Sequence, residues 1–376
     1  MKMQRQNSRL GFTLLELMVS MALGLIVMAA MASLFKTGLN SAMIVTQRAE
    51  TQQNMRAAID LMVKDISLAG AGLPTGGIQL PTGTGSTASK YACDQAGTCH
   101  VPVYTYPTGN FMYGIIPGYQ NGVEANAAIA AAPAPRFSDS ITVVYTDYNF
   151  PIWEYWACFP TGANGGSLNV YANTAYSPAP PAINSAGGIQ AGDLIMVSGG
   201  GLTAVGEVTT TPTSTGMTFA NLDALNMNQS GATSGNLKAI QSAVGSCTAA
   251  TPTAGTNSVG LYRLYAVTYY INVPAGATTV PPTQTPRLMR QVNGLTPVPV
   301  ADDIINLQFA FDSDNAGALD ANQPNPLGVG ESPNNFQKVN IIVMGQSIIQ
   351  NSRSSQNMYL ATSVSARNMT FRNRYQ

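Results

Sequence analysis

The sequence predicts an α+β fold in which one long N-terminal helix packs on a mostly antiparallel β-sheet domain. An apolar run from Phe12 to Phe35 is followed by residues 42–69 without Pro or Gly, which favours a helix through both segments. Beyond Pro74, short islands rich in β-branched and aromatic residues lie between Gly-, Ser-, Thr- and Pro-rich segments. These islands do not alternate with helical patterns, which argues against a parallel α/β sheet.

The apolar run Phe12–Phe35 contains one charged residue, Glu16. A helix of roughly 20 apolar residues crosses the hydrocarbon core, so the run predicts a single membrane span. Lys2, Arg5 and Arg9 precede it, and the positive-inside rule then places the N-terminus in the cytoplasm and the bulk of the chain outside it. A cleaved secretory signal has a shorter apolar region, whereas a plain signal anchor remains an alternative.

Glu16 is the unusual residue of this span. A carboxylate residue at the bilayer centre costs about 2.5–3.5 kcal/mol on the translocon scale, so its presence indicates a function. The alternative is that the side chain extends toward the interface and leaves its carboxylate in water.

Residues 36–72 are predicted to continue the helix as an amphipathic segment. Gly70, Gly72 and Pro74 are expected to end it. Apolar residues recur at helical spacing along one face, which we expect to pack on the β-rich domain: Met55, Ile59, Met62, Val63 and Ile66.

The remaining chain, residues 73–376, is predicted to be a β-rich extracytoplasmic domain, with a possible inserted subdomain at about 160–257. The expected strands are 141–148, 152–159, 193–198, 204–208, 261–271, 287–292, 304–312, 339–349 and 360–366. The expected loops or weakly ordered insertions are 74–90, 160–190, 199–216 and 228–257.

The chain has four cysteines, Cys93, Cys99, Cys158 and Cys247, an even number that suits disulfides outside the cytoplasm. Three pairings are possible. The close spacing of the first two favours a local bridge, which would leave the last two to pair. A metal site with His100 is the alternative, but adjacent ligands on a Gly-rich loop match no common zinc spacing.

Composition argues against strong nonspecific binding of nucleic acid. The 376 residues include 18 basic and 18 acidic ones, and only 10% are charged. Residues 12–376, which lack Lys2, Arg5 and Arg9, have an excess of acidic over basic residues. No dense Lys/Arg run provides the basic patch that such binding needs.

The order Arg9-Leu10-Gly11-Phe12-Thr13-Leu14-Leu15-Glu16 resembles the processing site of type IV prepilins. The resemblance implies a leader peptide, residues 1–11, that a prepilin peptidase removes by cutting between Gly11 and Phe12. It also implies N-methylation of the new amine of Phe12. Residues 12–35 would then be both the membrane span and the filament-core helix.

The segments 53–58, 65–70, 261–265, 288–292, 300–309 and 366–368 resemble the PilW class of minor type IV pilins. The resemblance implies a non-catalytic pilin that takes part in priming or in a tip complex. Its partners would be other minor pilins, the major pilin and the inner-membrane assembly platform. Glu16 would pair with the terminal amine of a neighbouring subunit, because an unpaired charge in a helix bundle is strongly penalised. Minor pseudopilins of type II secretion share the leader and are the close alternative.

Residues 312–320 form a degraded match to a calcium loop. Asp312, Asp314 and Asp320 supply oxygen ligands at suitable positions, with Gly317 at the turn, but Gln323 stands where a Glu is expected. A plain Asx-rich turn explains the segment equally well. We expect no other cofactor.

An enzymatic function has little support in the sequence. The chain has one histidine and no common nucleophile, phosphate-loop or zinc-protease motif, so we expect neither catalysis nor a small-molecule substrate. The alternative of another class is a pilus-tip adhesin or DNA-binding module. Candidate aromatic platforms for it are Tyr104, Tyr106, Tyr113, Tyr119, Trp153 and Trp156, although such residues also serve as strand and core residues.

Overall fold

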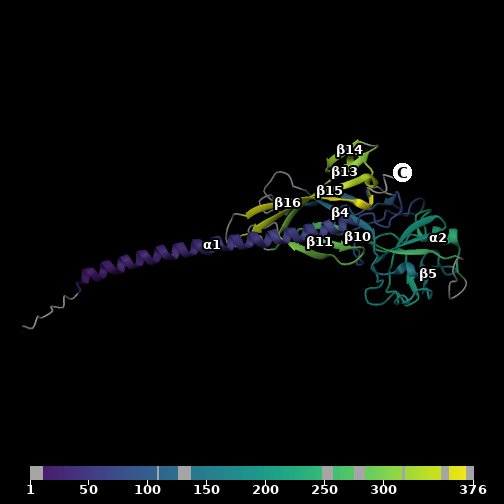
Figure 1. Ribbon diagram of the computed structural model, residues 1–376, viewed down its shortest axis with the longest axis horizontal. Coiled ribbons are helices and arrows are strands. Elements are labelled where there is room, and N and C mark those ends of the chain that lie inside the picture. The colour runs from purple at the N-terminus through teal and green to yellow at the C-terminus, as the bar shows by residue number, and fades with distance from the viewer. Residues whose placement is uncertain are drawn as a thin grey trace, which may run out of the picture.

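The computed structural model describes residues 12–107, 110–125, 137–247, 257–274, 284–315, 318–348 and 355–369. One 54-residue helix, α1 (Leu14–Ser67), extends as a stalk from a β-rich body (Figure 1). At 1.5 Å per residue it is about 80 Å long. The predicted α+β class, a long N-terminal helix followed by antiparallel sheets, is confirmed.

Helix α1 ends at Ser67, before the predicted limit at residue 72. The backbone N–H of Leu68 bonds to the carbonyls of Asp65 and Ile66, which closes the last turn. Gly70 follows with a φ of +75°, a conformation that a side chain would strain. The glycine signal therefore predicted the stop and misplaced it by a few residues.

The largest sheet has seven strands, and the main path runs in the order β12-β11-β10-β4-β3. The central strand β10 also pairs with β7, which in turn pairs with β8, and every pairing is antiparallel. The strands are β3 (Ile115–Val123), β4 (Phe137–Thr146), β7 (Leu194–Gly199), β8 (Leu202–Glu207), β10 (Gly260–Asn272), β11 (Arg287–Val292) and β12 (Val298–Asp302).

A second antiparallel sheet has four strands in the order β14-β13-β15-β16. Its members are β13 (Ile304–Asn315), β14 (Ala318–Gln323), β15 (Phe336–Ile348) and β16 (Ser355–Ser365). Two short 3-10 helices, Pro326–Val329 and Pro333–Asn335, connect β14 to β15.

The chain between β4 and β10 builds a smaller unit at the end of the body farthest from the free part of α1 (Figure 1). It contains a 3-10 helix, Ile152–Glu154, and a three-stranded sheet of β5 (Tyr155–Cys158), β6 (Ser167–Ala172) and β9 (Gly216–Thr218). Helix α2 (Leu237–Val244) packs near β7 and β8. A short pair, β1 (Ile78–Gln79) and β2 (Phe111–Met112), completes the described strands.

All nine predicted strands are present: β11 has the predicted ends, the other eight have shifted ends, and residues 152–154 of the predicted strand 152–159 form a 3-10 helix. The structure also corrects the predicted loops. β6 lies inside 160–190, where Leu168 and Val170 are buried at alternate positions. α2 lies inside 228–257, where Leu237 and Ile240 face the core. Asn236 caps α2 by accepting a hydrogen bond from the Ala239 N–H at 2.8 Å. Both elements are short, and their Gly- and Ser-rich flanking residues led to the prediction of loops.

Smaller strands were also missed. β1 lies in the predicted loop 74–90, and β2, β3, β9, β12 and β14 were not predicted. Several of these are short or carry Gly or Pro, which weakens the pattern of a strand.

The C-terminal part of α1 lies in one core with both larger sheets. Met55, Ala58, Met62 and Ile66 are fully buried, and Ile59 is 8% exposed. They pack in one cluster with inward-facing residues of the seven-stranded and four-stranded sheets, among them Ile141, Val267, Leu307 and Val343. The predicted stripe from Met55 to Ile66 is thus confirmed, with Val63 only partly buried at its edge.

Candidate functional site

The N-terminal half of α1 is apolar and packs against no other described part of the chain. Every residue from 12 to 43 is exposed, including Leu14 at 78% and Met28 at 69%. One 18-residue window of α1 has a mean hydropathy of 2.3 and is wholly unburied. Among the described helices, α1 is the one with the length and apolar composition to cross a membrane. Burial of this surface needs lipid or another protein.

Glu16 lies in the first turn of this exposed half. Thr13 caps the helix, because its Oγ1 accepts a hydrogen bond from the Glu16 N–H at 3.3 Å. The same hydroxyl approaches Glu16 Oε2 at 3.5 Å. A carboxylate is favoured at a helix N-terminus, where unpaired backbone N–H groups carry positive partial charge.

The structure thus holds the Glu16 carboxylate one turn from Phe12, whose side chain is 85% exposed. Gly11, the other predicted processing residue, lies outside the described residues. The role of Thr13 was missed at the sequence level. Its signal was a hydroxyl residue three positions before a Glu, which is a capping-box pattern.

At the other end of α1, a buried polar cluster fixes the helix to the seven-stranded sheet. Asp65 is 3% exposed and accepts hydrogen bonds from the Tyr145 hydroxyl at 3.0 Å and the Tyr269 hydroxyl at 2.6 Å. Arg290 Nε lies 2.9 Å from the same carboxylate. Burial and the neighbouring Asp65 charge raise the pKa of both tyrosines, which therefore stay neutral donors.

The Asp65 carboxylate thus receives bonds from strands β4, β10 and β11 at once. This arrangement sets the angle and depth at which the stalk enters the body. It was missed at the sequence level because its members are separated by up to 225 positions.

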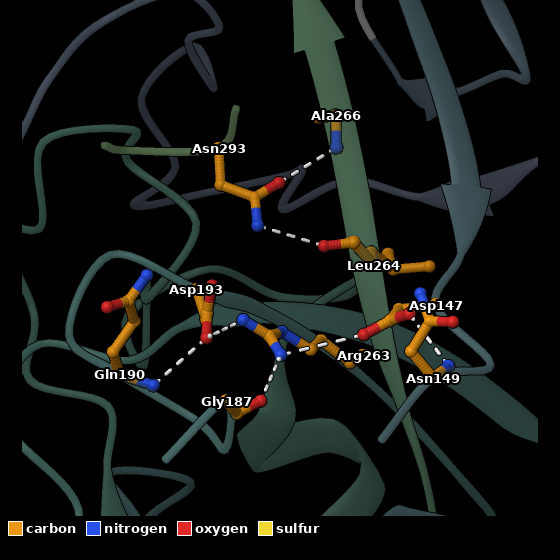
Figure 2. A network of polar contacts seen from close by, with 9 residues as sticks. All are labelled: Asp147, Asn149, Gly187, Gln190, Asp193, Arg263, Leu264, Ala266 and Asn293. Carbon is orange, nitrogen blue, oxygen red and sulfur yellow. Dashed lines mark hydrogen bonds and ion pairs between the residues drawn. The ribbon is translucent and has the colours of Figure 1, made fainter. Parts of the chain in front are cut away.

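A second buried cluster joins the small unit to the central strand of the large sheet (Figure 2). Arg263 of β10 is 7% exposed, and its Nη2 lies 2.9 Å from Asp193 while its Nη1 lies 3.5 Å from Asp147. Nη1 also donates to the Gly187 carbonyl at 3.2 Å. Burial raises the pKa of Asp193, and the adjacent guanidinium opposes that rise.

Figure 2 also shows Asn293, which bonds to the backbone of Leu264 and Ala266. The two contacts are 2.9 and 2.8 Å long. The ion pairs of Arg263 with Asp193 and Asp147 and its bond to Gly187 join separate segments of the chain, so the arrangement serves the connection between the two units.

The four cysteines form two disulfides, Cys93–Cys99 and Cys158–Cys247. This is the pairing that the spacing favoured. The second bridge connects β5 to the chain that follows α2. Because Cys93 and Cys99 are bridged to each other, neither offers a thiolate to a metal ion. The neighbouring His100 lies 3.0 Å from Asp94 and stacks on Tyr270.

The calcium-loop residues lie on a β-hairpin. Asp312 and Asp314 belong to β13, and Asp320 belongs to β14. The Asp312 carboxylate pairs with Lys338 at 2.8 Å, and this contact helps to lower the pKa of Asp312. In the part of the chain that the structure describes, no group of three or more Asp, Glu, His or Cys side chains could hold a metal ion. Calcium binding stays a prediction.

The candidate aromatic platforms lie in different environments. Tyr106 is buried edge-on against Tyr91, and Lys90 lies over the ring of Tyr104. Trp153 is 40% exposed beside Tyr148. The remaining members are Tyr113 and Tyr119 near β2 and β3 and Trp156 in β5.

Residues 6–32 match the family described as the prokaryotic N-terminal methylation motif. The match covers Gly11, Phe12 and Glu16, and with them the exposed end of α1. A comparison with curated proteins gave no match, and neither did a comparison with solved structures.

Proposed function

We propose that this chain, which its N-terminal methylation motif identifies as a type IV pilin-like or pseudopilin-like protein, is a non-catalytic minor pilin of the PilW class that takes part in pilus assembly. The observation that carries the proposal is the division of α1. Its first half exposes an apolar surface with a single carboxylate, while its second half is buried in its own body. An apolar stalk of this kind suits both a membrane and a bundle of like helices.

In the proposed cycle, the inner membrane first covers the stalk. The body lies in the periplasm, with the N-terminus toward the cytoplasm. Prepilin peptidase then removes residues 1–11 and leaves the amine of Phe12 as the new terminus. At the assembly platform the subunit moves from lipid into the fibre.

Glu16 gives the docking step its specificity. In a helix bundle the Glu16 carboxylate gains a partner, the terminal amine of a neighbouring pilin, and loses the penalty of an unpaired charge. Pairing depends on axial register, because the two groups meet at only one relative height. Thr13 keeps the carboxylate beside the helix end, which limits the conformations that docking must restrict.

Deletion of this protein from the cell tests its proposed role in pilus assembly directly. We expect deletion to reduce the number of pili and to dissociate a complex of the other minor pilins. Normal pili with a defect in protein secretion would instead support a minor pseudopilin. Normal pili that fail to adhere or to take up DNA would support a tip adhesin or DNA-binding module.

Processing has its own test. Gly11→Val should leave the longer precursor on a gel, because the peptidase must accommodate the residue before the cut. N-terminal sequencing of the mature wild-type protein should begin at Phe12. A mature chain that begins elsewhere would overturn the prepilin interpretation.

A further inference from the structure

A cleft of about 530 Å³ lies where the seven-stranded sheet meets the outer face of the four-stranded sheet. One wall comes from β3 and β4, and the floor comes from β13 and β15 with a contribution from β14. The volume falls in the range of small-molecule sites. Neither the stalk nor either disulfide takes part in it.

The floor presents carboxamide side chains. Asn306 is 3% exposed, and its Nδ2 donates to Glu124 at 2.8 Å, while its Oδ1 is buried with no hydrogen-bond partner among the described residues. The Gln308 side chain is exposed and makes no hydrogen bond within the described part of the chain. Each carboxamide offers two donor hydrogens and an acceptor oxygen. The exposed Gln308 carboxamide therefore offers the cleft both a donor and an acceptor that the described chain leaves unused, whereas Asn306 Oδ1 is buried below the surface.

The wall is fixed and partly aromatic. Asp139 accepts hydrogen bonds from the Gln120 N–H at 2.7 Å and the Phe309 N–H at 2.9 Å, which ties β3 to β13. Tyr119 is 41% exposed and Phe137 is 43% exposed at the same cleft. Rings held on strands provide flat apolar faces at low entropic cost.

The charges of the lining exclude anionic ligands. Glu124 and Asp139 are its ionisable acids, and the described lining contains no Lys or Arg. A phosphate, a nucleic acid or an acidic sugar would meet repulsion without a counter-charge.

The backbone of the floor also excludes one mode of peptide binding. β15 is paired with β13 on one side and β16 on the other, so its N–H and C=O groups are occupied in ladders. An extended peptide could not add to this floor as a strand, because strand addition needs a free edge. Recognition at this floor therefore comes from side chains.

We propose that this cleft binds an uncharged saccharide. Sugar hydroxyls both donate and accept hydrogen bonds, which matches the free carboxamide of Gln308. The C–H face of a sugar ring is apolar and fits a flat ring such as that of Tyr119. The site goes beyond the proposed role in assembly and does not depend on it, since the cleft lies in the body and the assembly surface lies on the stalk.

The test uses the full-length chain in lipid nanodiscs, because detergents with sugar headgroups would compete for the site. Binding is first measured on an array of neutral and acidic oligosaccharides and then by calorimetric titration with the neutral glycan that gives the strongest signal. We expect saturable binding of neutral glycans alone. Gln308→Ala and Tyr119→Ala should each weaken it about tenfold, the size of one lost hydrogen bond or stacking contact.

Tyr359→Ala is the matched control, because Tyr359 is a 74% exposed aromatic residue on β16 that does not line the cleft. It should bind as the wild type does. Gln308 is an exposed side chain, so its variant keeps the test informative if Tyr119→Ala does not fold. Absence of neutral-glycan binding, binding of acidic glycans alone, or binding that survives Gln308→Ala would overturn the proposal.

Discussion

Residues 14–43 of α1 expose their Leu, Met, Ile and Val side chains, whereas residues 51–67 of the same helix bury theirs against two sheets. The contrast is visible in single residue types. Met28 is 69% exposed and Met62 is fully buried, although both lie on one uninterrupted helix. Two of the acidic residues of α1 differ in the same way: among the described residues the Glu16 side chain approaches Thr13, whereas Asp65 has two tyrosines and Arg290.

The comparison teaches that the two halves are stabilised by different surroundings. The second half obtains its partners when the chain folds. Under the proposed function, the first half obtains them from lipid or from other subunits, and its sequence then affects localisation and assembly more than the folding of the body. Substitutions can separate the two contributions.

The largest effects on folding should come from Asp65→Ala and, with an overlapping range, from Met62→Ala. The Asp65→Ala change leaves the Arg290 guanidinium and two buried hydroxyls without their acceptor, and loss of one member of a buried ion pair costs about 3–5 kcal/mol. Because Arg290 is partly exposed, we expect the lower end of that range. The measurement is denaturant unfolding of the full chain in micelles.

Asp60→Ala serves as the control for that variant, since Asp60 is an exposed acidic residue on the same helix. It should change the free energy of unfolding by less than about 0.5 kcal/mol. Equal effects of the two substitutions would show that the cluster around Asp65 does not hold the helix.

The next effect concerns the two methionines. Met62→Ala opens a cavity between α1 and the sheets and should destabilise the body by about 2–5 kcal/mol. Met28→Ala removes a side chain that contacts solvent or lipid and should leave the unfolding of the body unchanged. Thermal or denaturant unfolding of both variants in the same micelles gives the answer. A similar loss of stability in Met62→Ala and Met28→Ala would show that the two halves of α1 do not differ in their contribution to folding.

The effect that is smallest per step of change is a pH dependence that belongs to the body alone. Burial, together with the neighbouring Asp223 carboxyl, raises the pKa of Glu207 to about 9. The folded state then holds a proton that the unfolded state releases above its ordinary pKa near 4.5. Stability is therefore fully present below that value and falls as pH rises toward 9, by up to about 1.4 kcal/mol per pH unit.

Glu207→Gln should flatten this slope when the free energy of unfolding is measured between pH 5 and pH 8. Met28→Ala should retain the slope of the wild type, because the exposed half of α1 is not part of the titrating unit. A slope that persists in Glu207→Gln would assign it to another group.

Periodicity explains what could be predicted of this molecule. The Met55 to Ile66 stripe repeats at helical spacing, and the long strands have strong β-branched patterns, so α1 and the main strands followed from the sequence. α2 and β6 are short, and their Gly-rich neighbourhoods outweighed a weak local signal. Strand ends shifted in both directions, since pairing lengthens β16 to begin at Ser355, whereas β5 is shorter than predicted because a 3-10 helix takes its first residues.

The polar clusters could not be predicted because their members come from distant segments. Arg263 meets Asp147 and Asp193 only after β4, β7 and β10 are in register. Asp65 likewise resembles any other acidic residue near the end of a helix until Tyr145 and Tyr269 are placed beside it. Glu16 could be singled out because one carboxylate in an apolar run needs no tertiary information to appear unusual.

The central claim is that the exposed half of α1 is an assembly surface in which Glu16 finds its partner outside the chain. The most direct measurement is the amount of Glu16→Ala protein, relative to wild type, in purified pili and in co-purified complexes of minor pilins. Glu50→Ala is the control, because Glu50 lies on the same helix but beyond the apolar run. We expect Glu16→Ala to be processed and membrane-bound yet strongly depleted from both fractions, with Glu50→Ala close to wild type. Normal incorporation of Glu16→Ala would contradict the account.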